Sequence, residues 1–274
     1  MKEIKIEIGQ EAFTYRCPEG WGEVTQRQWV AVVGQLLTYG ELTPLGVKAV
    51  LGIKNSESVR LMPIDWHVLG AELEWMKELE GVKGWMVEEV ELPDGRKCYP
   101  PAANFDDMTW EEFMFVDVSA ARKAWDVVAA CLYRPLKEAA TEEEDERIAF
   151  SRFGVSARLP MFKGLSPLLL SAIEINYMLL RKRMTDLYPN IFRGGSRKVK
   201  RQPSAAAGDG DTQQPSTAAG TDWVGVYRRL LGEHVWEEER LLKLPVNTVL
   251  FRLDVMVKDG KEREKEMRRA RRRR

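Results

Sequence analysis

A short pattern that marks the start of a helix occurs twice in this sequence. It consists of an apolar residue, a Thr, a Gln or Glu three positions after the Thr, and an aromatic residue, and it reads VTQRQW at residues 24–29 and MTWEEF at residues 108–113. The Thr side chain can bond to the backbone N–H three residues on, while the Gln or Glu side chain bonds back to the Thr backbone. The apolar and aromatic residues can touch as a hydrophobic staple. Each copy therefore predicts a helix N-terminus packed on a core.

Each copy follows a stretch that predicts a β-hairpin. Isoleucines alternate with charged residues before Gly9, and apolar residues alternate again up to Cys17, which predicts a hairpin over residues 2–17. The turn signal Pro93-Asp94-Gly95 predicts a second hairpin within residues 85–99. The Thr residues of the two patterns are 84 positions apart, at 25 and 109. An internal duplication and the independent reuse of common capping residues both explain this repeat.

Helical periodicity accounts for most of the remaining sequence up to residue 193. The apolar spacing and the helix start signals predict helices from Thr43, from Pro63 to Leu79, from Thr109 to about Tyr133, and from Ser166 to Leu187. The last of these is apolar on nearly every side, which is typical of a central buried helix.

Residues 194–221 differ in composition from the rest of the chain. They are mostly Gly, Ser, Ala, Pro and Gln with almost no large apolar residue, so they bury too little surface to offset the entropy lost on ordering. We predict a flexible linker here, between a main domain over residues 1–193 and a C-terminal module over residues 222–274. The predicted fold class is mainly α: a helical bundle-like main domain with two small β-hairpins, the linker and a small C-terminal helical module.

The C-terminal module carries an apolar stripe with helical spacing. The part of the module before its basic tail, residues 222–257, has 36 residues, which form only a marginal fold alone. We therefore expect these apolar side chains to bind another protein, as an amphipathic helix does in a groove. The candidate partner-binding residues are Trp223, Leu241, Leu244, Val246, Val249, Leu250, Leu253 and Val257.

Charge is unevenly distributed although the formal net charge is zero. Residues 258–274 contain ten Lys or Arg and four Asp or Glu, a net charge of +6, which leaves −6 for residues 1–257. The candidate polyanion-contacting residues are Arg268, Arg269, Arg271, Arg272, Arg273 and Arg274. Phosphate contact, contact with an acidic protein and a simple solvated helix end all stay open for this tail.

Patterns that carry catalysis are almost absent. The chain has two His, and its three Cys have no CxxC spacing; it has no phosphate-binding glycine loop, nucleophile elbow or metal-ligand cluster. We expect three buried thiols, a His67 that is a packed core or boundary residue, and a non-enzymatic protein without metal or cofactor. A Cys–His nucleophile and a two-carboxylate hydrolase are the weaker alternatives.

The sequence also predicts a cytoplasmic protein without a membrane partner. The longest apolar stretch free of charges and amides, Leu165–Ile173, is far shorter than the ~20 residues that span a bilayer. The first residues lack the apolar region of a signal peptide.

The layout of the chain resembles that of a known family. The segments VTQRQWVAVVGQLL and MTWEEFMFVDVSAARKAWDVVAACLYRP, the Ser/Gly/Ala-rich linker, and DWVGVYRRLLGEHVWEEERLLKLPVNTVLFRLDVMVKDGK resemble accessory proteins of tailed bacteriophages, in particular tail assembly chaperones. The resemblance covers the arrangement of most of the chain and includes no invariant motif. It implies a non-enzymatic protein of the host cytoplasm that binds the long helical tape-measure protein, or another tail component, and keeps it soluble before tail-tube assembly. The alternative is a nucleic-acid-associated phage or mobile-element protein that acts through the Arg-rich tail.

Overall fold

The protein is mainly α-helical, as the sequence predicts. The computed structural model describes residues 1–61, 64–137, 146–192 and 237–272. It is 61% helical, and the described residues include two small antiparallel two-stranded sheets. None of the described helices combines the length and the apolar character that crossing a bilayer requires.

The chain folds into two compact units, each built from two stretches of sequence. Unit 1 contains Met1–Asn104 and Trp125–Lys182, and unit 2 contains Phe105–Ala124 and Arg183–Arg274. The predicted domains, residues 1–193 and 222–274, are divided differently, because residues 105–124 belong with the C-terminal helices. The predicted linker over residues 194–221 lies outside the described residues.

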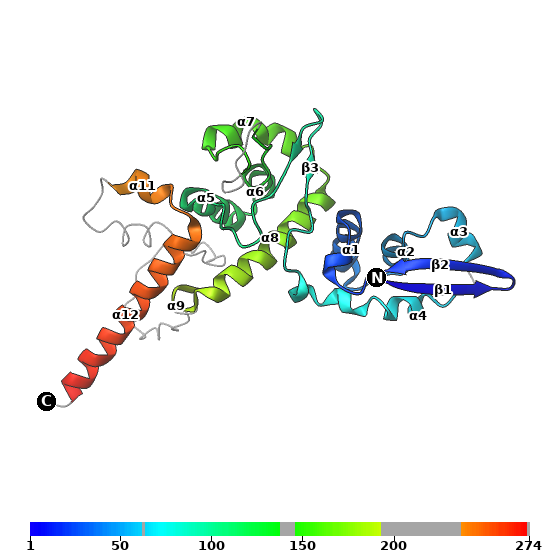
Figure 1. Cartoon of the computed structure of the whole chain (residues 1–274), viewed down its shortest axis with the longest axis horizontal. Helices are drawn as coiled ribbons and strands as arrows, with labels where there is room; N and C mark the ends of the chain where they lie inside the picture. Colours follow the sequence, from blue (N-terminus) through cyan, green and yellow to red (C-terminus); the bar gives the residue numbers. More distant parts are fainter. Residues whose placement is uncertain (62–63, 138–145, 193–236, 273–274) are drawn as a thin grey trace, which may run out of the picture. The chain divides into compact units, whose positions relative to one another are not determined.

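Unit 1 contains both hairpins and most of the helices (Figure 1). Its strands and α-helices are β1 (Lys2–Ile8), β2 (Glu11–Cys17), α1 (Gln26–Tyr39), α2 (Pro44–Leu51), α3 (Asn55–Arg60), α4 (Trp66–Ala71), β3 (Val90–Glu91), β4 (Lys97–Cys98), α6 (Trp125–Leu132), α7 (Arg152–Phe162) and the first part of α8 (Pro167–Leu187). Short 3-10 helices cover Trp21–Glu23, Glu74–Lys77 and Leu79–Gly81.

The first hairpin and the first capped helix follow the prediction. Strands β1 and β2 pair from Lys2↔Cys17 to Ile8↔Glu11. The Thr25 side chain accepts a bond from the Gln28 N–H at 3.3 Å, and the Thr25 N–H donates to Gln28 Oε1 at 2.7 Å, which is a complete capping box. The second hairpin is confirmed but short, since β3 and β4 have two residues each.

Two predicted helices are wrong in their extent. The helix predicted from Thr109 to Tyr133 is two helices, α5 (Trp110–Ala121) and α6, because the chain turns at Lys123 with a φ of 58°. The Ala124 N–H bonds to the Ser119 carbonyl and the Lys123 N–H to the Ala120 carbonyl, which is a Schellman ending. The helix predicted from Pro63 stops at Ala71, because the hydrogen bonds that follow span three residues instead of four.

Asn176 on α8 fixes an extended segment of unit 1. Its fully buried side chain accepts bonds from the N–H groups of Met86 (2.5 Å) and Val87 (3.3 Å), and donates to the Gly84 carbonyl at 3.0 Å. One amide thus satisfies three backbone groups that lack a strand partner. The prediction that α8 is buried on all sides is wrong, because Leu168 and Met178 are 41% and 47% exposed.

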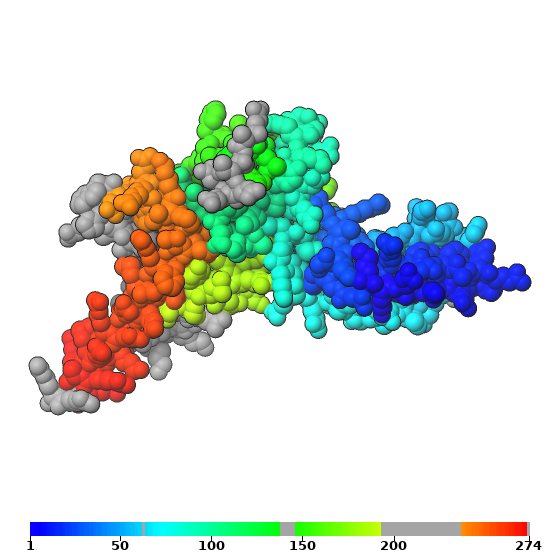
Figure 2. Space-filling view, viewed as in Figure 1, coloured from blue at the N-terminus to red at the C-terminus, as the bar shows by residue number. Residues whose placement is uncertain are grey.

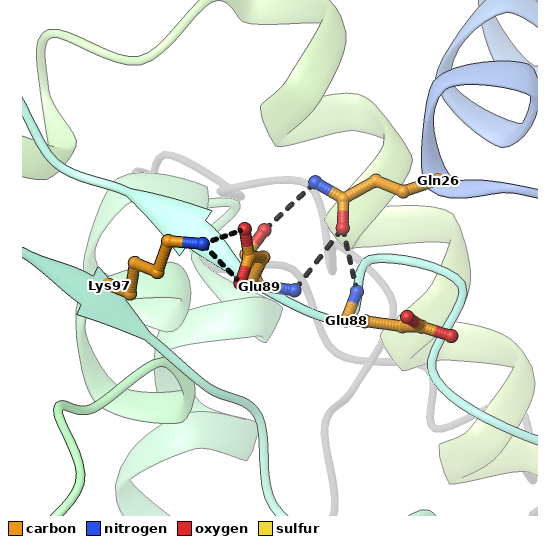
Figure 3. A network of polar contacts seen from close by, with 4 residues as sticks. All are labelled: Gln26, Glu88, Glu89 and Lys97. Carbon is orange, nitrogen blue, oxygen red and sulfur yellow. Dashed lines mark hydrogen bonds and ion pairs between the residues drawn. The ribbon is translucent and has the colours of Figure 1, made fainter.

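Gln26, at the start of α1, holds the next part of the same segment (Figure 3). Its side-chain oxygen accepts bonds from the N–H groups of Glu88 (2.8 Å) and Glu89 (3.2 Å), and its nitrogen donates to the Glu89 carbonyl at 2.8 Å. The Glu89 carboxylate pairs with Lys97 on β4 at 2.9 Å. The backbone of residues 84–89 is thus hydrogen-bonded by two amide side chains, Gln26 of α1 and Asn176 of α8, in place of a neighbouring strand.

Unit 2 is built around one long helix. It contains α5, the end of α8, α9 (Pro189–Phe192), α11 (Glu238–Leu242) and α12 (Val246–Arg272), and α12 contacts both α5 and α9 (Figure 1). With 27 residues, α12 is about 40 Å long at 1.5 Å per residue.

We expect Asn176→Leu to lower the free energy of unfolding of unit 1 by at least about 2 kcal/mol. The change leaves two buried N–H groups and one partly buried carbonyl unpaired, and each buried group costs about 1–3 kcal/mol. Urea unfolding followed by circular dichroism measures the effect. Asn55→Leu, at an exposed position of α3, is the control and should change stability little. Equal effects of the two variants would contradict the role given to Asn176.

Candidate partner-binding surface

Two helix N-termini of unit 2 cap each other through their backbones. The Trp110 N–H, at the start of α5, donates to the Leu244 carbonyl at 2.8 Å, and the Val246 N–H, at the start of α12, donates to the Met108 carbonyl at 2.9 Å. The first N–H groups of a helix have no partner within it. Each segment therefore supplies a carbonyl acceptor for the first N–H group of the other helix. This pairing sets the point from which α12 extends.

The predicted apolar stripe faces the interior of unit 2. Val246, Val249 and Leu250 are at most 1% exposed, and Leu253 is 5% exposed. Leu241, Leu244 and Val257 are partly buried, and Trp223 lies outside the described residues. The expectation that this stripe is open to a partner is therefore corrected for its four buried members, because α12 packs with α5 and α9 in the same unit.

Polar contacts fix the same side of α12 to α9. The Asp254 carboxylate accepts bonds from the backbone N–H groups of Asn190 (2.8 Å) and Ile191 (3.3 Å), and from the Asn190 side chain at 2.8 Å. It acts as an N-terminal cap for α9 supplied by another helix. Four turns of α12 are therefore held in place, because the Lys261 ammonium also donates to the Asn190 carbonyl at 3.0 Å.

Tyr188 adds a second polar contact near the start of α12. Its hydroxyl donates to the Asn247 side-chain oxygen at 3.1 Å, and the Asn247 side-chain nitrogen donates to Asp106 at 2.5 Å. Burial raises the pKa of the Tyr188 hydroxyl, and the carboxylates of Asp106 and Asp254 raise it further. The hydroxyl therefore stays protonated and available as a donor throughout the neutral pH range.

A second stripe, which we call the outer seam, lies beside the buried stripe on α12, about 100° around the helix axis at Phe251 compared with Leu250. Its members recur at alternating spacings of four and three residues, the repeat of a coiled-coil seam, and all are exposed. They are Phe251, Val255, Lys258, Glu262, Lys265, Arg269 and Arg272. Phe251 is 63% exposed and Val255 is 41% exposed, so the seam begins with two uncovered apolar residues and continues with four cations and one carboxylate.

Beyond Val255 the charges beside the outer seam are separated by sign. Asp259 and Glu266 flank it on one side, and Lys261 and Arg268 flank it on the other. At the start of the seam, Arg252 and Asp254 occupy these flanks with the reverse signs. Every residue from Lys258 to Arg272 is exposed, and the space-filling view shows this part of α12 in red (Figure 2). The surface thus has an apolar start, a basic seam and flanks of opposite charge.

The predicted polyanion-contacting arginines continue this helix. Arg268, Arg269, Arg271 and Arg272 are exposed on α12, and Arg268 pairs with Glu264 at 2.5 Å. Arg273 and Arg274 lie outside the described residues.

The residues considered for catalysis are placed unfavourably for it. Cys17, Cys98 and Cys131 are buried free thiols, and burial raises the pKa of the Cys98 thiol to about 11, so the reactive thiolate is scarce at neutral pH. His67 is exposed at the edge of a cavity of about 340 Å³, and the expectation of a packed His67 is wrong. Within the described ranges, no three His, Cys, Asp or Glu side chains converge as metal ligands would.

Comparisons with known proteins add no assignment. Scans of the chain against protein-family models, curated proteins and solved structures each found no match. The resemblance to tail assembly chaperones therefore stays a prediction.

Sequence reasoning found the buried stripe of α12 and missed the outer seam. The seam has a signal in the sequence, the alternating four- and three-residue spacing between residues 251 and 272. It contains only two apolar residues, however, so a search for apolar periodicity finds the denser buried stripe beside it.

We expect neighbouring substitutions on α12 to differ strongly in their effect on stability. Leu250→Ala should cost about 3 kcal/mol, because it leaves a cavity in the core of unit 2. Phe251→Ala should change stability by no more than about 0.5 kcal/mol, because that side chain is largely in solvent. Hydrogen exchange of the α12 amides measures both effects, and similar protection losses would contradict the assignment of the two faces.

Asp254→Ala should loosen α9. The change removes the acceptor for the N–H groups of Asn190 and Ile191, and loss of a cap costs about 1–2 kcal/mol. Faster hydrogen exchange of these two amides is the expected result. Asp254→Asn retains one acceptor oxygen and should show a smaller increase, whereas unchanged exchange in both variants would disprove the capping role.

Proposed function

We propose that this chain is a non-enzymatic interaction protein that acts as a tail assembly chaperone of a tailed bacteriophage. In this role it binds the long helical tape-measure protein in the host cytoplasm and keeps it soluble until the tail tube assembles. The layout of the sequence, as compared above with that family, supports the proposal at the level of the family.

The observation that carries the proposal is the exposed part of α12. The exposed part of α12 is polar all round and leaves its own core, as do helices that cross solvent between two folded parts. Phe251 and Val255 provide apolar area beside Asp254, which contacts α9, and the charges beyond them provide orientation. A long helical client offers many surfaces that such a helix can engage.

A nucleic-acid-associated function is the second candidate. It is supported by the four exposed arginines between Arg268 and Arg272, since phosphate contacts need no base-specific residues. The acidic residues Asp259, Glu262, Glu264 and Glu266 lie along the same part of the helix and would repel phosphates, so this candidate is the weaker one.

Co-expression tests the chaperone function. We expect the full chain to raise the soluble fraction of the long helical tape-measure protein encoded beside it at least several-fold, because it covers apolar helices that otherwise aggregate. The soluble fraction is measured by centrifugation and quantitative gel analysis.

The matched control for this test is Leu45→Asp, which changes an exposed apolar residue of unit 1 (66% exposed) and should leave the rescue intact. Equal solubility of the tape-measure protein with and without the chain would disprove the proposed function.

A further inference from the structure

The structure points to the outer seam as a docking site for a partner α-helix that is acidic, and we infer that recognition runs through complementary charge. This inference rests on the proposed function and adds the surface and the chemistry of the client segment. The partner helix would have apolar residues opposite Phe251 and Val255 and mainly Asp or Glu opposite the cationic seam positions.

The first step is that, among the described residues, the side chains that hold α12 in unit 2 are not members of the seam. They are Val246, Leu250, Leu253, the Asp254 carboxylate and the Lys261 ammonium. Phe251, only one residue from Leu250, is 63% exposed. The described part of unit 2 therefore leaves the outer seam exposed.

The second step concerns the sign of the charge on the partner helix. Beyond Val255 the seam carries Lys258, Lys265, Arg269 and Arg272 against Glu262, a net charge of +3. Like charges across a helix pair are unfavourable and opposite charges are favourable. An acidic seam on the partner, with one basic residue opposite Glu262, satisfies all five positions.

The third step excludes a second copy of the chain as the occupant. In a parallel pair of α12 helices each seam cation would face its own counterpart. In an antiparallel pair Glu262 can face Lys258 or Lys265. The first register places Lys265 and Arg269 opposite Val255 and Phe251, and the second places Lys258 opposite Arg269. Each arrangement sets cations against cations or against apolar residues, so self-association through this seam is unfavourable.

The fourth step favours a helix over a nucleic acid. The flank formed by Asp259 and Glu266 runs beside the basic seam, and a phosphate backbone would meet it with the wrong sign. A helix can place basic residues against that flank and acidic residues against the cations of the seam. In helix pairs, the charged residues that flank the seam form salt bridges with the partner, and their signs determine which partner binds.

Synthetic peptides test this inference directly. The probe is a fluorescein-labelled helical peptide with Leu at two seam positions and Glu at the next ones, and its matched peptide carries Lys in place of each Glu. Fluorescence anisotropy with the full chain should show binding at least about tenfold tighter for the acidic peptide, since four favourable exposed pairs together exceed the 1.4 kcal/mol of a tenfold change. Raising the salt concentration should reduce this preference.

A charge-reversal variant locates the effect. Lys258→Glu combined with Lys265→Glu should abolish or reverse the preference, and circular dichroism should show an unchanged fold because both side chains are exposed. The control variant, Lys5→Glu combined with Lys54→Glu, makes the same net charge change at exposed positions of unit 1. It should leave the preference intact.

Three results would overturn the inference: equal binding of the two peptides, a preference that survives the Lys258/Lys265 reversal, or tighter binding of a 20-base-pair DNA duplex than of the acidic peptide. Failure of the proposed function is distinguishable from these results. If the acidic peptide binds as expected but co-expression does not solubilise the tape-measure protein, the docking site stands and the chaperone function falls.

Discussion

The backbone pairing between residues 108–110 and 244–246 is the interaction on which unit 2 depends. It joins segments that are more than a hundred residues apart in the chain, and it satisfies the first N–H group of both α5 and α12. A buried N–H without a partner costs about 1–3 kcal/mol, so neither helix begins as favourably without the other. Once the pairing forms, the apolar stripe of α12 meets α5 and α9, and the C-terminal helix becomes part of a core.

The two faces of α12 divide structural and functional demands between them. The inner stripe and Asp254 hold the helix in its unit, so substitutions there act on stability. The outer seam contributes little to the fold, because Phe251, Val255 and the charges after them are exposed. A surface of this kind can change its charge pattern without changing the fold, which allows specificity for a partner to be adjusted independently of stability.

Local signals made the fold class and the helix starts predictable, whereas long-range packing was not. Thr25 and Gln28 lie three residues apart, so their capping box is encoded in a few residues. Apolar periodicity showed that one side of α12 is buried, but it carries no information on what covers it, and α5 supplies the cover from far away in sequence. The turn at Lys123 was also missed, because Lys is not a residue that normally marks a left-handed helix end. For the candidate site, the sequence indicated that α12 is the helix concerned, but it did not indicate the outer seam.

The division of unit 2 between two distant stretches of chain has a consequence for biosynthesis. Helix α5 ends at Ala121 and α12 begins at Val246, and ribosomes add about 5–20 residues per second. On the order of ten seconds therefore pass between the emergence of α5 and that of the helix it packs against. Unit 2 closes only after α12 has been synthesised, and until then the nascent polypeptide carries an incomplete core.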